Sequence, residues 1–351
     1  MYELGVGTNR FRALRTLSCM TLAVGMSLTA AQSQSPTEPM VFEGAAGGAR
    51  LLEEGQELAM VHPTVEDARR AQENVIRPRG QTTTASGGNL SYHGGTGGIG
   101  VETAPKVYLV LWGSQWNSND PSGEAAILES FYMGVGGSAW SNTVTQYCQG
   151  VPSGTIFCDG AGTPAGNPAA IYAGVFVDNS AAAPTHPRQS QIGSEAVRAA
   201  QFFGNTRSGS NKSVQYVIAT ATRNSSSGFG VSYCAYHSST RSSYGKIAYT
   251  NLPYQTDAGA SCGAGFNGLG ATAGITIVAG HEMAETMTDQ FPSTGWLDST
   301  GSEIGDKCAW ISSGQGAAAM VTFPNGSSFP VQSLFSNAFS GGAGGCVLSY
   351  P

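Results

Sequence analysis

The segment "VAGHEMAETMTDQ", residues 278–290, places His281 beside Glu282 and puts a second glutamate, Glu285, four residues after the histidine. Residues i and i+4 of a helix lie on one face, so a helix here points the His281 and Glu285 side chains in the same direction. An imidazole nitrogen and a carboxylate oxygen can both bind one zinc ion at about 2.0–2.2 Å. In the HExxH motif of zinc proteases, which has histidine at both positions, the glutamate after the first histidine is the general base. The segment therefore predicts a metal-binding helix with Glu282 as the catalytic base.

An acid-rich segment further along the chain, "GWLDSTGSEIGDKCAW" at residues 295–310, offers the third ligand that such a site needs. Acids are scarce in this protein, in which charged residues make up only 11% of the sequence. One large class of zinc proteases takes a glutamate as its third ligand after a comparable gap. We therefore expect Glu303 to fill this role, with Asp306 as the second candidate. Asp289 is a third candidate, because it lies two helical turns beyond His281 on the same face.

A metal-free polar cluster is the alternative, because a glutamate four residues after a histidine is common in helices. However, the preceding "GITIVAG" is almost wholly apolar. A buried helix that carries a histidine and several acids loses solvation energy unless those groups have partners, which favours a bound metal. His281 favours zinc, whereas the excess of carboxylates leaves calcium as the alternative ion.

His237, in "SYCAYHSST", is a further candidate for the site, as a metal ligand or as a proton donor in the transition state. The alternative is a structural histidine that only makes hydrogen bonds. Ser-His-Asp catalysis lacks support, because no serine lies in a GxSxG motif. The glycine-rich "GGTGGIG" lacks the lysine of a phosphate-binding loop. A net charge of −6 gives no basic surface for nucleic acid.

The N-terminus and the cysteines indicate export. Residues 1–31 contain three arginines, then an apolar run and small residues, which is the pattern of a cleaved signal peptide. The run is too short for a membrane span, so we expect a secreted protein with no span after signal removal. Six cysteines follow residue 31, an even number that suggests three disulfides. Neighbour order favours the pairs Cys148–Cys158, Cys234–Cys262 and Cys308–Cys346, although the sequence leaves other pairings open.

Residues 32–88 differ in composition from the rest of the chain and are predicted to be a propeptide or a flexible N-terminal arm. They hold a charge-dense amphipathic stretch and then a Gly/Thr/Ser-rich stretch that is typical of a linker. The alternative is that they pack on the main domain as an ordinary N-terminal helix. We assign residues 89–351 to a single main domain.

The main domain alternates predicted strands with predicted helices. Continuous apolar, β-rich runs predict buried strands at residues 106–113, 171–178, 214–221 and 245–254. Helical spacing of apolar residues predicts helices at residues 123–136, 190–204 and 269–288. We therefore expect an α/β (α+β) fold with a mixed central sheet, a long metal-site helix and a disulfide-stabilised, β-rich C-terminal tail.

Parts of the sequence resemble the secreted phosphate-induced, EXORDIUM-like family and its microbial members. They are "LSYHGGTGGIG…KVYLVLWGSQW", "YCAYHSS…GKIAYTNLPY", "GHEMAETMTDQFPSTGWLDSTGSEIGDKCAW" and the tail "FPVQSLFSNAFSGGAGGC". The microbial pattern HE-x-AE-x-x-TDP, GW-x-D and E-I-x-D-x-C matches, in order, His281, Glu282, Glu285, Thr288, Asp289, Trp296, Asp298, Glu303, Asp306 and Cys308. One departure is Gln290, where the family has proline, and this change removes no ligand. The resemblance covers patches of residues 90–350 and implies a secreted protein with a zincin-like domain and metal site.

Two functions are compatible with these residues. The first is a secreted zinc-dependent hydrolase, a metallopeptidase of extracellular proteins or peptides, whose 32–88 segment covers the site until it is removed. His281, Glu285 and Glu303 would bind zinc, and Glu282 would take a proton from the water that attacks a carbonyl carbon. The second is a non-catalytic protein of the cell wall or matrix with a structural metal or none, since plant members of the family have mostly lost these residues. We expect a monomer in either case.

Overall fold

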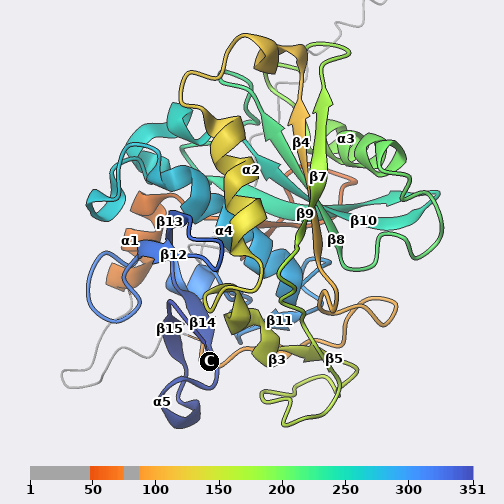
Figure 1. The fold of residues 1–351 in the computed structure, drawn as a ribbon. Coiled ribbons are helices and arrows are strands. Elements are labelled where there is room, and N and C mark those ends of the chain that lie inside the picture. Colours follow the sequence, from red (N-terminus) through yellow and green to blue (C-terminus); the bar gives the residue numbers. More distant parts are fainter. Residues whose placement is uncertain (1–47, 75–86, 351) are drawn as a thin grey trace, which may run out of the picture. The chain divides into compact units, whose positions relative to one another are not determined.

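A mixed seven-stranded sheet is the central element of the computed structural model, which describes residues 48–74 and 87–350 (Figure 1). The strands in spatial order are β1 (Gly48–Arg50), β2 (Ala59–His62), β9 (Ala235–Ser242), β10 (Gly245–Leu252), β8 (Val214–Thr220), β4 (Lys106–Trp112) and β7 (Tyr172–Asp178). The last four are parallel to one another, whereas β9, β2 and β1 extend the sheet by antiparallel pairing. The mixed α/β architecture confirms the prediction. The predicted signal peptide lies outside the described residues.

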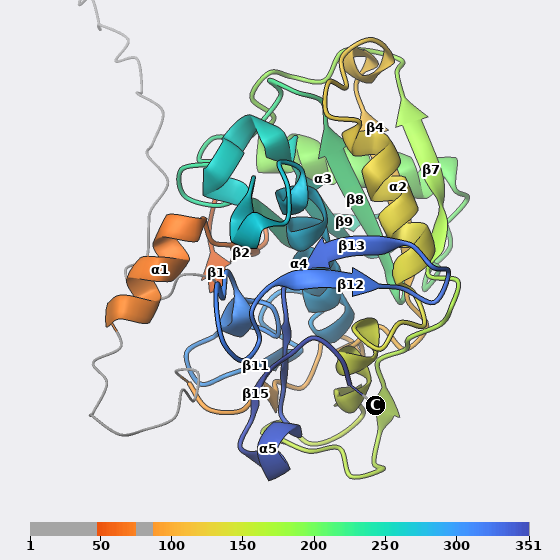
Figure 2. The ribbon, with the colours of Figure 1, turned by 60° about the vertical axis from the view of Figure 1, so that its left-hand side comes forward.

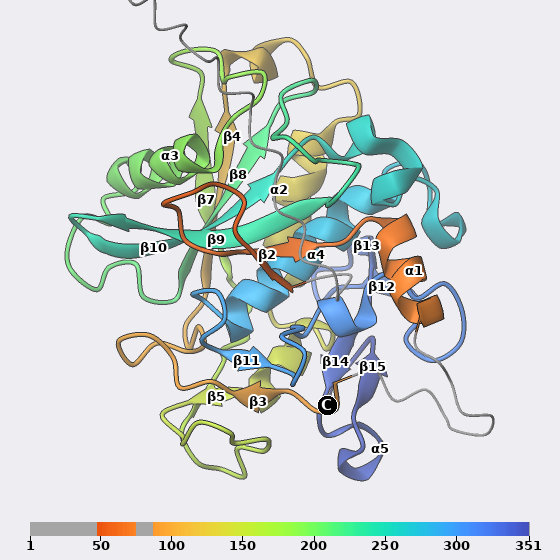
Figure 3. The same cartoon turned by 180° about the vertical axis from the view of Figure 1, so that it is seen from behind.

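Helices cover both faces of the sheet, because the strands alternate apolar side chains toward either side. Along β4, Val107, Leu109 and Leu111 join the core beneath α2 (Glu124–Val135) and α4 (Ala273–Thr288). Val110 points the other way and packs against α3 (Gln189–Phe202). Figures 1 and 3 show α3 on one side of the sheet and the other two helices on the opposite side. These helices and the strands β4, β7, β8 and β10 confirm the predicted elements, although α4 begins at residue 273 rather than 269.

Helix α4 is buried along its whole length of 16 residues, as its nearly continuous apolar sequence requires. It packs on β9 and β10 of the sheet, on α2, and on the hairpin of β12 (Ala319–Thr322) and β13 (Ser328–Val331), which lies in front of it in Figure 2. Gly280 permits this crowding, because a Cβ there would lie 3.1 Å from the rings of Phe131 and Trp140. Packing against these elements therefore fixes the position of α4 and of the polar residues that it carries.

The chain after α4 forms short antiparallel pairs, which confirms the predicted β-rich tail. Besides the β12–β13 hairpin, β14 (Leu334–Ser336) pairs with β15 (Gly345–Val347), and the short helix α5 (Phe339–Gly342) lies between them in the chain. Two more pairs join distant segments: β3 (Ser91–Tyr92) with β11 (Trp296–Leu297), and β5 (Cys148–Gln149) with β6 (Thr163–Pro164). Short 3-10 helices occur at Ser114–Asn117, Ser141–Gln146, Gln255–Cys262, Phe266–Gly268 and Asp306–Cys308.

Three disulfides join Cys148 to Cys158, Cys234 to Cys262, and Cys308 to Cys346, in the neighbour order that the sequence favours. The last of these ties the acid-rich segment after β11 to the C-terminal strand β15. Disulfides persist in oxidising compartments, so the three bridges are compatible with a secreted protein. Within residues 48–74 and 87–350, no helix combines the length and the apolar character that crossing a membrane requires.

Residues 48–74 belong to the predicted propeptide or flexible arm, but the structure builds them into the fold. Strands β1 and β2 extend the central sheet, with Met60 opposite His237 of β9, and α1 (Val65–Asn74) follows. All four residues of β2 are buried. This part of the segment is therefore not a loose arm, and residue 88 is not a boundary of the folded unit. The reason is that one side of β9 would otherwise have unpaired backbone N–H and C=O groups, and β2 forms hydrogen bonds with them.

Candidate metal centre

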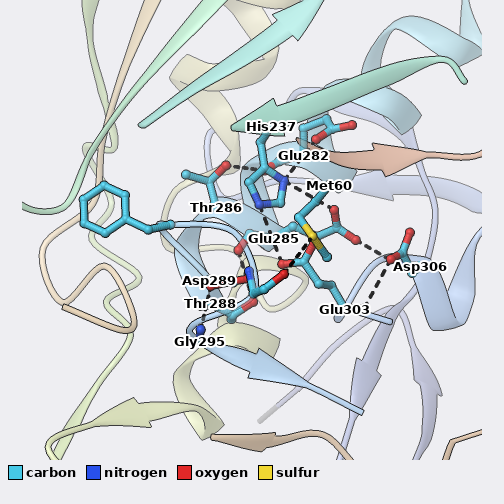
Figure 4. A network of polar contacts seen from close by, with 12 residues as sticks. Met60, His237, Glu282, Glu285, Thr286, Thr288, Asp289, Gly295, Glu303 and Asp306 are labelled. Carbon is cyan, nitrogen blue, oxygen red and sulfur yellow. Dashed lines mark hydrogen bonds and ion pairs between the residues drawn. The ribbon is translucent and has the colours of Figure 1, made fainter. Parts of the chain in front are cut away.

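Three of the five histidines in the chain gather with four acids where α4 passes the β2–β9 edge of the sheet. The residues are His62 of β2, His237 of β9, His281, Glu282 and Glu285 of α4, and Glu303 and Asp306 of the segment after β11. In Figure 4, His237, Glu285, Glu303 and Asp306 face one another, with dashed lines marking their contacts. The structure thus brings together all six residues predicted for the site, and His62 is an addition to them.

His281 presents a free imidazole nitrogen to two acids. Its Nε2 lies 2.9 Å from Glu285 Oε1 and 3.8 Å from Asp306 Oδ1. On the other side of the ring, Gln332 donates its amide nitrogen to the carbonyl of Gly305 at 2.8 Å, so its Oε1 accepts from His281 Nδ1 at 3.1 Å. This hydrogen bond holds the proton of a neutral imidazole on Nδ1 and leaves the Nε2 lone pair for a ligand, which is the usual arrangement of a metal-binding histidine.

His237 makes a second set of contacts with acids, and it shares only Glu285 with His281. Its Nδ1 lies 3.3 Å from Glu282 Oε2 and 3.6 Å from Glu285 Oε2, and its Nε2 lies 3.7 Å from Glu303 Oε1. The donors therefore fall into two groups whose ligand atoms lie within 4.8 Å of one another: His237, Glu285 and Glu303, and His281, Glu285 and Asp306. Of the two acids predicted as third ligand, Asp306 joins His281, whereas Glu303 joins His237.

These side chains are withdrawn from water and leave many polar atoms without a protein partner. His62, His237, His281, Glu282, Glu285 and Glu303 are 0% exposed. Eight buried atoms of the cluster lack a hydrogen-bond partner: Nε2 of His62, His237 and His281, Oε1 of Glu282, Oε2 of Glu285, both carboxylate oxygens of Glu303, and Oδ1 of Asp306. Nearly all buried polar atoms in proteins are hydrogen-bonded. So many unpartnered atoms in one cluster therefore indicate a binding site for a ligand or an ion.

Burial shifts the pKa of each group toward its uncharged form. It raises the pKa of Glu285 to about 8 and lowers the pKa of His237 and of His281 to about 3. It also raises the pKa of Glu282, Glu303 and Asp306 well above the ordinary values, and repulsion from Glu285 acts in the same direction. A divalent cation has the opposite effect on the acids and also favours neutral imidazole. The donor set therefore fits a cation held by carboxylates and neutral histidines.

Asp289, the third predicted candidate for the last ligand, has a structural role. Its carboxylate accepts backbone N–H groups of Ser293 at 2.6 Å, Thr294 at 3.0 Å and Gly295 at 2.6 Å. These bonds occupy both oxygens and fix the turn that follows α4. Asp289 therefore positions the start of the acid-rich segment and does not offer a free oxygen to the histidines.

A close approach of the backbone at Gly305 completes the site. A Cβ at this position would lie 2.6 Å from His281 Nδ1 and 2.9 Å from Glu285 Oε1. The absence of a side chain lets the segment after β11 approach α4, and the backbone N–H of Asp306 donates to Glu285 Oε1 at 3.0 Å. Gly305 therefore brings Asp306 within reach of His281.

The strand β2 covers the cluster. The ring of His62 packs on the ring of His281 with centroids 3.9 Å apart, and its Nδ1 donates to the carbonyl of Pro63 at 2.9 Å, which leaves Nε2 as the atom without a partner. Sequence reasoning missed His62 and Gln332. Each is a polar residue within an apolar stretch, and this contrast is the only local signal that they carry.

Comparison of the chain with protein-family models, with characterised proteins and with solved structures finds no match. The resemblance to the EXORDIUM-like family therefore stays a prediction.

Proposed function

We propose that this protein is a secreted, metal-dependent hydrolase of peptide bonds, with zinc as its metal and a zincin-like, EXORDIUM-like domain. The observation that carries the proposal is the set of eight buried polar atoms without partners, contributed by three histidines and four acids. Removing several charged groups from water costs several kcal/mol per group unless they are paired. A cation at the centre of the cluster offsets this cost for all of them together.

His281, Glu285 and Asp306 are the residues that hold the ion beside α4. Two donors on a tetrahedral zinc ion lie about 3.3–3.6 Å apart, and the corresponding distances here are 2.9 Å between His281 and Glu285 and 3.8 Å between His281 and Asp306. When bound, zinc supplies Lewis-acid chemistry, which polarises a carbonyl group and makes water more acidic.

Glu282 is the general base. It follows the ligand His281 directly in α4, and its Oε1 has no protein partner, so this atom can accept a proton from the attacking water and pass it to the leaving amine. Burial raises its pKa, and a bound cation would act in the opposite direction and keep the carboxylate ionised, as a base must be. His237 Nδ1, 3.3 Å from Glu282 Oε2, orients the carboxylate.

An extended peptide is the substrate that the surrounding strands favour. β2 pairs with β9 in antiparallel register and places His62 against the metal-site histidine. Without β2, β9 would be an edge strand, and edge strands bind extended peptides by the same backbone hydrogen bonds. The substrate would therefore take the place of β2 once residues 48–74 have moved away, which gives this segment the role of a cover.

The alternative is a non-catalytic extracellular protein with a structural metal. The observation that favours it is the complete burial of the cluster, because structural metal sites are closed whereas catalytic sites keep an open position. Casein cleavage by the purified protein, before and after removal of the N-terminal segment, separates the two. Cleavage that is lost in Glu282→Gln supports the hydrolase, and bound zinc without cleavage in either form supports the structural role.

A further inference from the structure

The two carboxylate oxygens of Glu285 face different histidines. Oε1 lies 2.9 Å from His281 Nε2, and Oε2 lies 3.6 Å from His237 Nδ1. Asp306 Oδ1 lies 3.8 Å from the same nitrogen of His281, and Glu303 Oε1 lies 3.7 Å from the other ring nitrogen of His237, Nε2. One ligand atom each of His237, Glu285 and Glu303 nevertheless lie within 4.8 Å of one another. Glu285 is thus placed as a bridge between two sets of donors.

One ion cannot use both sets as they are arranged. Donors bound to a single ion at 2.0–2.2 Å lie at most about 4.4 Å from one another. The two groups of donors within 4.8 Å of one another share only Glu285, and His237 and His281 fall into separate groups. One ion could bind both His237 and His281 only if these side chains moved from the positions that they have in the structure.

The charge of the cluster also exceeds what one divalent cation balances. Glu282, Glu285, Glu303 and Asp306 carry four negative charges when ionised, and a histidine binds a metal ion through its neutral imidazole. Two divalent cations neutralise the four carboxylates, and they give partners to atoms of both donor sets, including both oxygens of Glu303.

We infer that this site binds two divalent cations bridged by Glu285, one held with His281 and Asp306 and the other with His237 and Glu303. The inference rests on the metal site of the proposed function and extends it. Paired ions about 3.5–4 Å apart are a known arrangement of hydrolytic sites, in which both the attacking and the leaving atoms are stabilised. His237 is then a metal ligand, the first of the two roles that the sequence suggests for it.

The test is the metal stoichiometry of the purified full chain. Protein freed of metal with a chelator is titrated with zinc in a calorimeter, and we expect two equivalents per chain. His237→Ala and Glu303→Gln should each retain one equivalent, whereas His186→Ala, an exposed histidine elsewhere, should retain both. In manganese-loaded protein, spin coupling between the ions should be present in the wild type and absent in His237→Ala.

One equivalent in the wild type, or unchanged content in a folded His237→Ala, would overturn the inference. If a variant fails to fold, the wild-type titration and the spin coupling decide the matter alone. The metal stoichiometry tests the two-ion site independently of the proposed hydrolase activity. One equivalent with Glu282-dependent casein cleavage sinks only the two-ion site, and two equivalents without cleavage sink only the hydrolase.

Discussion

The imidazole rings of His62 and His281 lie 3.9 Å apart, centroid to centroid, although one ends a strand near the N-terminus and the other lies in the buried helix α4. The candidate metal centre is therefore closed by a segment of its own chain. Access of a substrate to the candidate metal centre would therefore require displacement of the segment that carries His62.

Displacing residues 48–74 should activate the protein. The sequence recognised by a site-specific protease is inserted between residues 74 and 87, and the protein is cut and separated from the released segment. Casein cleavage should rise at least about tenfold, because only the uncovered state binds substrate. A synthetic peptide of residues 57–64 should inhibit the activated form by pairing again with β9. The uncut insertion variant is the control, and a separated protein no more active than this control would contradict the covering role.

Removing the metal should destabilise the fold. An ion that binds only the folded state stabilises it by about 2.7 kcal/mol at a free concentration 100-fold above its dissociation constant. A chelator should therefore lower the melting temperature of the wild type and of His186→Ala equally. The melting temperature of His281→Ala should respond less to the chelator. Identical responses in all three proteins would show that the stabilising ion lies elsewhere.

Gly305→Ala should weaken metal binding and leave the fold in place. The new methyl group would meet His281 Nδ1 and Glu285 Oε1, so the segment that carries Asp306 must move away from α4. Disturbing the residues that orient metal ligands commonly lowers affinity by about 10–100-fold, and calorimetric titration with zinc measures the change. Gly193→Ala is the matched control, because it crowds Thr240 on the other face of the sheet. Equal zinc affinity in the two variants would refute the proposed role of Gly305.

Glu102 should make stability fall with rising pH. It is 0% exposed, Gln215 Nε2 donates to its Oε2 at 2.8 Å, and burial raises its pKa to about 8 from the ordinary 4.5. The folded state therefore keeps the proton that the unfolded state releases, so stability is full below about pH 4.5 and is lost as the pH rises toward 8. The loss is at most about 1.4 kcal/mol per pH unit. Glu102→Gln should lack this component in urea denaturation at pH 5 and pH 8.5, and parallel pH profiles of the two proteins would count against it.

Local patterns account for the elements that the sequence predicts well. The apolar runs of β4, β7, β8 and β10 and the spacing in α2, α3 and α4 each carry their own signal. Strand β9 carries no such signal, because "AYHSSTRS" is polar and is buried only where β2 and α4 cover it. Strand β2 has a short apolar sequence, but its pairing with β9 is a contact between distant parts of the chain.

The site residues, like the elements of the fold, were predictable where a local sequence pattern carries them and not where distant parts of the chain meet. One turn of helix fixes His281 and Glu285, and the acid-rich segment is short enough that Glu303 and Asp306 both reach them. Which acid serves which histidine depends on the approach of the backbone at Gly305, and no sequence pattern reports that distance. His62 and Gln332 come from the two ends of the chain, so only the folded structure places them beside His281.

The metal content of the natively purified protein tests the central claim most directly. Elemental analysis of the wild type, Glu282→Gln and His281→Ala distinguishes a ligand from a base that does not bind the ion. We expect zinc in the wild type, the same amount in Glu282→Gln, and at least one equivalent less in His281→Ala. A wild-type protein that contains no metal and takes up none from added zinc, or equal content in the two variants, would contradict the account.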